Sequence, residues 1–148
     1  MDWVNPYGLA VMAVIMVPNV LFAVRCRGGF ENLWKNRWVE LLEQIGRFAC
    51  FALMAVMLPG TGFGSDEAFA AYLTINGILA FAYCLIWAIC FRKNSVFRAL
   101  ALSILPSAIF LSSGVLTCSV PLMVAAAIFA PCHIAISYQN ARLVEKED

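Results

Sequence analysis

The stretch RWVELLEQIGRFACFALMAVML, residues 37–58, decides the fold class of this chain. It is long enough to cross the ~30 Å hydrocarbon core of a membrane as a helix, and its second half is purely apolar. Its first half carries Glu40, Glu43, Gln44 and Arg47, which a 3.6-residue period places on one stripe. Charge costs about 3 kcal/mol at the centre of a membrane on insertion scales. The stripe is therefore expected to face protein or water.

The composition of the whole chain excludes a soluble globular domain. The 148 residues are 63% hydrophobic and 13% charged, whereas soluble domains contain about 25% charged residues. Long apolar runs without alternation favour helices over a membrane β-barrel. We therefore predict an all-α, polytopic membrane protein. Its residues 1–148 form a single domain with five transmembrane helices at about 5–24, 38–58, 68–91, 97–116 and 120–138.

The basic residues flank the predicted helices on one side only. They are Arg25, Arg27, Lys35 and Arg37 after the first helix, Arg92, Lys93 and Arg98 after the third, and Arg142 and Lys146 after the fifth. The opposite side carries Asp2, Asp66 and Glu67 and no basic residue. The positive-inside rule then places the N-terminus outside and the C-terminus in the cytoplasm of a multi-pass cell-membrane protein. Membrane lipids are the expected partners, and nucleic acid is not, because these residues belong to no recognition motif.

Five polar residues form the candidate ligand-binding site: Asn19, Glu43, Gln44, Arg47 and His133. Counted from the predicted cytoplasmic helix ends, Asn19, Glu43 and His133 lie roughly 8 Å deep, and Arg47 lies near the midplane at ~15 Å. Prolines close to Asn19 and His133 free backbone carbonyls that can line a cavity. The pattern predicts a polar cavity open to the cytoplasm. Its guanidinium suits an anionic or zwitterionic ligand.

Each of these residues also has a purely structural interpretation. Glu43 and Arg47 are four residues apart, so they can neutralise one another on the helix. His133 can be a hydrogen-bonded packing residue, and Asn19 can join two helices. Neither a metal site nor a cofactor is expected, because His133 is the only histidine and the six cysteines form no Cys-x-x-Cys pair. No catalytic residue can be named.

Three functions are compatible with this pattern. The preferred one is a small transporter or channel-like protein that binds or moves an ion or a small anionic or zwitterionic solute, as a homo-oligomer. The second is an intramembrane enzyme acting on a lipid-like substrate, with Glu43 or His133 as acid–base group and Arg47 binding an anionic head. The third is a structural or accessory membrane subunit, in which the Glu43–Arg47 pair specifies helix packing.

Overall fold

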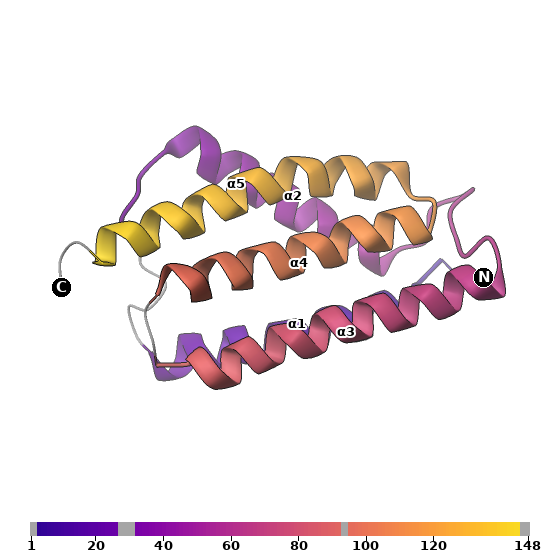
Figure 1. The fold of residues 1–148 in the computed structure, drawn as a ribbon. Coiled ribbons are helices and arrows are strands. Elements are labelled where there is room, and N and C mark those ends of the chain that lie inside the picture. Colours follow the sequence, from indigo (N-terminus) through magenta and orange to yellow (C-terminus); the bar gives the residue numbers. More distant parts are fainter. Residues whose placement is uncertain (1–2, 27–31, 93–94, 146–148) are drawn as a thin grey trace.

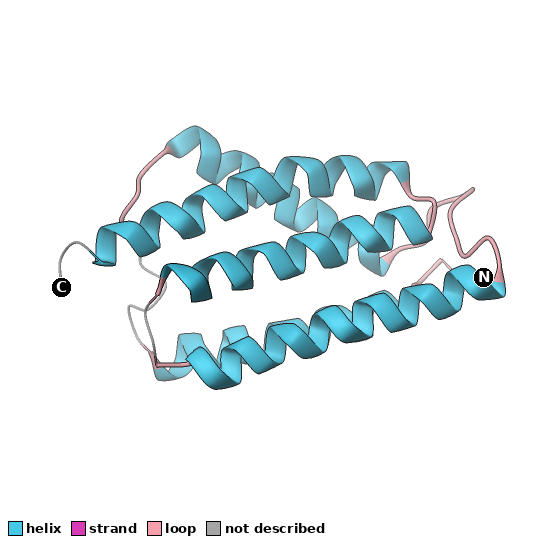
Figure 2. Cartoon of the chain, in the orientation of Figure 1, coloured by secondary structure: helices cyan, strands magenta, loops and turns pink. Residues whose placement is uncertain are grey.

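Five α-helices account for most of the chain. The computed structural model describes residues 3–26, 32–92 and 95–145. Within these ranges the helices are α1 (Pro6–Arg25), α2 (Arg37–Ala55), α3 (Asp66–Cys90), α4 (Val96–Leu116) and α5 (Val120–Glu145). The remaining described residues form loops (Figure 2), apart from one isolated antiparallel bridge between Val4 and Val56. The prediction of an all-helical chain with five helices is confirmed.

Four of the helices begin at a residue whose side chain caps the first turn. Each cap accepts a hydrogen bond from the amide three residues later: Asn5 from Gly8, Asn36 from Val39, Ser65 from Ala68 and Ser95 from Arg98. Asparagine and serine are suited to this position because their short side chains satisfy amides that have no partner within the helix. Local sequence thus sets these helix starts.

Two predicted helix ends are corrected by the structure. The second helix ends at Ala55 rather than near residue 58, because Val56 is extended and the Met57 amide donates to the Trp3 carbonyl at 2.8 Å. The fifth continues past Tyr138 to Glu145. Hydropathy marks only the apolar part of a helix, so it missed the polar last turns, where Asn140 binds the segment before α2.

Consecutive helices run in opposite directions along one bundle (Figure 1). α5 packs between α2 and α4, and α3 packs on α4 and α1. The start of α1 and the end of α5 lie at opposite ends of the bundle, which we call the N-terminal end and the C-terminal end. Of the basic residues that predict the orientation, Arg27, Lys93 and Lys146 lie outside the described residues, as does Asp2. The other basic residues at helix ends gather at the C-terminal end.

Four helices are long and apolar enough to span a membrane: α1, α3, α4 and α5. They expose large apolar side chains, among them Val24, Phe81 and Phe97 at 71%, 70% and 65%. A soluble protein seldom exposes so much contiguous apolar surface, so these helices are compatible with a multi-pass membrane protein. α2 is not among the four, because Arg37, Glu40, Glu43 and Arg47 interrupt its apolar sequence.

Candidate functional site

α2 turns Glu43 of the polar stripe toward the bundle and most of its large apolar side chains away from it. Its buried residues are Glu43, Gly46, Cys50 and Met54, spaced as one helical face. Trp38, Phe48 and Ile45 are exposed at 75%, 67% and 56%, and Leu41 and Leu42 are exposed as well. A soluble protein normally has the opposite arrangement, with apolar side chains buried and charged side chains exposed. It is the arrangement expected of a helix that contacts lipid on one face and protein on the other.

Gly46 sets the distance between α2 and α5. A Cβ atom added at Gly46 would lie 2.9 Å from the Cβ of Phe129 and 3.0 Å from its Cα, closer than packed carbon atoms approach. Only glycine allows the two helices to meet this closely. One turn along α5, the His133 ring stacks on the Phe129 ring, with centroids 4.6 Å apart and planes 21° from parallel. This close contact therefore positions His133 over α2.

A buried carboxylate with two basic partners forms the centre of the site. One oxygen of Glu43, Oε1, accepts hydrogen bonds from Arg47 Nε at 3.0 Å and from Arg47 Nη2. His133 Nδ1 lies 2.9 Å from the same oxygen, so the ring N–H donates to the carboxylate. We call Glu43, Arg47 and His133 the polar trio. It combines two residues of α2 with one of α5, separated by 90 positions in the chain.

Exposure differs strongly among the three side chains. Glu43 is 3% exposed, whereas Arg47 is 43% and His133 is 23% exposed. A buried carboxylate is tolerated only when it is paired and hydrogen-bonded, and both conditions are met here. The Glu43 side chain is thus enclosed, whereas the Arg47 side chain is partly exposed at the surface of the bundle.

The structure gives Asn19 different partners from those of the polar trio. Its Nδ2 donates to the Ile15 carbonyl at 3.1 Å, and its Oδ1 accepts from the Tyr83 hydroxyl of α3 at 2.9 Å. No hydrogen bond among the described residues joins Asn19 to the trio. The carbonyl of Val14, whose usual helical donor is missing at Pro18, has the Cys84 thiol 3.9 Å away. Asn19 and its proline therefore serve the contact between α1 and α3.

The other two polar residues of the stripe also separate. Gln44 is exposed, on the side of α2 that carries Leu41 and Phe48. Glu40 accepts from Asn32 Nδ2 at 2.7 Å and from the Asn36 amide at 3.2 Å. The predicted stripe thus runs from the core at Glu43 out to the surface at Gln44.

A clamp that the sequence did not reveal joins the segment before α2 to the end of α5. Asn140 Oδ1 accepts from the Trp34 amide at 2.8 Å, and its Nδ2 donates to Asn32 Oδ1 at 2.9 Å. Asn32 in turn donates to Glu40. These residues are more than one hundred positions apart, so no local spacing could have indicated the contact. The clamp holds α2 against α5 beside the trio.

Polar residues nearer the N-terminal end form a second, separate cluster. Asn76 Oδ1 accepts from the hydroxyls of Ser112 and Ser113, both at 3.2 Å. Along the helices, the buried apolar residues Cys50, Phe110 and Phe129 lie between this cluster and the trio. The two polar regions are therefore divided by an apolar layer, in which Phe110 and Phe129 meet edge to face with centroids 5.5 Å apart.

The described residues hold no group of three or more His, Cys, Asp or Glu side chains that could bind a metal ion. The six cysteines are free thiols. In comparisons with known proteins, the chain matches no protein-family model, no curated protein and no solved structure.

Proposed function

We propose that α2 is a fifth transmembrane helix and that the C-terminal end of the bundle faces the cytoplasm. The support for the first part is the outward apolar face of α2, together with its course along the bundle beside α5 (Figure 1). Its 19 residues correspond to about 28 Å of helix at 1.5 Å per residue, close to the hydrocarbon thickness. The support for the second part is the set of basic residues at the C-terminal end.

We propose further that the polar trio binds the negative group of a small anionic or zwitterionic solute. The observation that carries this proposal is the contrast between the Glu43 side chain, which is 3% exposed, and the Arg47 side chain, which is 43% exposed. Glu43 holds Arg47 through Nε and Nη2, and Nη1 has no partner among the described residues. That nitrogen can donate to a carboxylate or phosphate that approaches from outside the bundle.

His133 completes such a site from α5, because its Nδ1 lies 2.9 Å from the Glu43 oxygen that Arg47 also contacts. Binding would be the first step of transport. A complete path would also require the apolar layer at Phe110 and Phe129 to open.

Ligand-dependent thermal stability of the purified protein in lipid nanodiscs tests this function. Inorganic phosphate, acetate and glycine are the simplest anionic and zwitterionic probes. At least one should raise the melting temperature in a saturable manner, and Arg47→Gln should abolish the effect. Arg142→Gln is the matched control, because it removes a basic side chain at the same end of the bundle but outside the trio. If no probe stabilises the protein, the binding function is wrong.

A structural role of the trio is the second candidate, and one observation favours it. Both partners of Glu43 come from this chain, so the buried carboxylate is satisfied without any ligand. In that case the trio fixes the register of α2 on α5, as buried polar groups do in other helical assemblies. Unchanged stability with every probe, together with a large loss on removal of Arg47, would favour this candidate.

We also propose that a second copy of the chain packs on the exposed stripe Leu41, Gln44, Phe48 and Ala52 of α2. These residues repeat the spacing of the buried stripe. Gln44 makes no hydrogen bond with the described residues, and an unpaired amide in hydrocarbon is costly. Because glutamine both donates and accepts, two copies related by a twofold axis can satisfy each other.

A further inference from the structure

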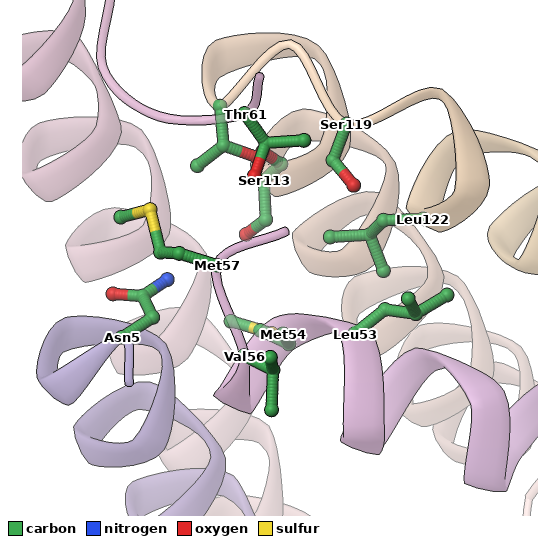
Figure 3. A pocket seen from close by; sticks show the side chains of 10 residues that line it. Asn5, Leu53, Met54, Val56, Met57, Thr61, Ser113, Ser119 and Leu122 are labelled. Atoms are coloured by element: carbon green, nitrogen blue, oxygen red, sulfur yellow. The ribbon is translucent and has the colours of Figure 1, made fainter. Parts of the chain in front are cut away.

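Three connecting segments meet around a small pocket at the N-terminal end of the bundle, far along the helices from the polar trio. They are the residues before α1, the segment after α2 and the turn between α4 and α5 (Figure 3). The polar lining residues are Asn5, Thr61, Ser113, Thr117 and Ser119. The space measures about 10 Å³, close to the ~10–15 Å³ that one buried water molecule needs on the same measure.

Backbone hydrogen bonds hold the walls of this pocket in place. The Asn5 amide donates to the Ala55 carbonyl at 2.8 Å, and the Gly62 amide donates to the Thr117 carbonyl at 2.9 Å. The Ser119 amide donates to the Gly114 carbonyl at 2.8 Å. Each of the three segments is thus held in place by main-chain hydrogen bonds, so the shape of the pocket is set by the fold.

Three of the lining hydroxyls already have protein partners. Thr61 donates to the Leu58 carbonyl and Thr117 to the Ser113 carbonyl, both at 2.7 Å. Ser113 donates to Asn76 Oδ1 at 3.2 Å, which leaves its oxygen able to accept a hydrogen bond. The hydroxyl of Ser113 is therefore an acceptor at the edge of the pocket.

Two other lining residues, Asn5 and Ser119, complete the polar wall of the pocket. Asn5 and Ser119 are each 4% exposed. The Ser119 hydroxyl makes no hydrogen bond with any part of the described chain, and the Asn5 side chain lies beside the hydroxyl of Tyr72. Ser119 directly precedes α5, where a serine hydroxyl ordinarily caps the first turn, yet here it lines the pocket (Figure 3).

We propose that this pocket binds one structural water molecule. The water accepts from the Asn5 NH₂ group, donates to Ser113 Oγ and exchanges a hydrogen bond with the Ser119 hydroxyl. Buried waters typically make about three such bonds to groups that otherwise lack partners. The side-chain oxygens that line the pocket are neutral, whereas Ca²⁺ and Mg²⁺ sites rely on carboxylates, so water fits better than a metal ion. The water ties the start of α1 to the turn between α4 and α5.

Hydroxyl-radical footprinting by X-ray radiolysis tests the proposal in lipid nanodiscs, because radicals form at bound water and oxidise neighbouring side chains. Met54 lines the pocket and is only 1% exposed. It should be oxidised rapidly in the unmodified protein, and at least fivefold more slowly in Ser119→Val, whose side chain fills the space. Ser107→Ala is the matched control, since its buried hydroxyl bonds directly to the Ser103 carbonyl at 2.7 Å, and should leave the Met54 rate unchanged.

Slow oxidation of Met54 in the unmodified protein overturns the proposal, as does an unchanged rate in a folded Ser119→Val protein. A high-resolution experimental density map gives a result that does not depend on any variant. It should show a peak within hydrogen-bond distance of both Asn5 Nδ2 and Ser119 Oγ. A map in which Asn5 and Ser119 bond to each other, with no density between them, contradicts the water site.

Discussion

At the scale of single residues, the unequal exposure of the polar trio determines what each substitution does. Arg47→Met leaves the buried Glu43 carboxylate with His133 as its remaining partner, which should cost about 3 kcal/mol. This corresponds to a melting temperature lower by roughly 6–12 °C for a domain of this size. Glu43→Gln leaves a guanidinium that water can reach, so it should cost only about 1 kcal/mol. Thermal unfolding in detergent micelles measures both changes.

The double substitution separates pairing from other effects of the two residues. Because Glu43→Gln/Arg47→Met removes both charges, its stability should exceed that of Arg47→Met alone. A double variant whose loss equals the sum of the two single losses would show that the charges do not interact.

At the scale of the helices, the contact between Gly46 and Phe129 controls how α2 meets α5. Gly46→Ala places a methyl group against the Phe129 backbone, so α2 must move away or the protein loses about 1–3 kcal/mol. Gly77→Ala is the matched control, because a Cβ on this α3 glycine meets nothing within 4 Å. It should be neutral or slightly stabilising, since alanine favours the helix. Equal melting temperatures for the two variants would contradict the close contact.

The exposed stripe of α2 gives a second prediction at this scale. Gln44→Leu keeps the stripe apolar but removes the amide that two copies would share. The dimeric fraction, measured by single-molecule photobleaching or crosslinking in lipid, should fall several-fold, because each interhelical hydrogen bond in a membrane contributes about 0.6–2 kcal/mol. Leu42→Ala changes an exposed residue outside the stripe and should leave the fraction unchanged. A monomeric unmodified protein would contradict the proposed dimer.

At the scale of the whole molecule, the predicted orientation can be tested with a native cysteine. Cys118 is exposed in the turn between α4 and α5, at the N-terminal end of the bundle. A membrane-impermeant maleimide should label it in intact cells, and Cys118→Ser should abolish that labelling. In the Cys118→Ser protein, a cysteine introduced as Arg142→Cys should react only after the membrane is permeabilised. Labelling of this second site in intact cells would reverse the orientation.

The amino-acid sequence by itself indicated a helical chain compatible with a membrane, and it determined the five helices and most of their starts. These depend on local properties: apolar composition, the 3.6-residue period and capping residues such as Asn36 and Ser65. It also identified Glu43 and Arg47 as a pair, because side chains four positions apart on one helix are neighbours on its surface. These parts of the fold and site need no knowledge of the neighbouring helices.

Only the tertiary structure decided which polar residues act together. Depth and periodicity predicted the same site for Asn19 and His133. In the packed bundle, however, Asn19 hydrogen-bonds to Tyr83 of α3, and His133 hydrogen-bonds to Glu43 of α2. The position of α5 depends on the missing side chain of Gly46, which lets the Phe129 backbone approach α2, and on the Phe129 ring, on which His133 stacks. Such contacts join residues 64 and 90 positions apart. The spacing of residues within one helix carries no information about a partner on another, so this part of the site required the packed bundle.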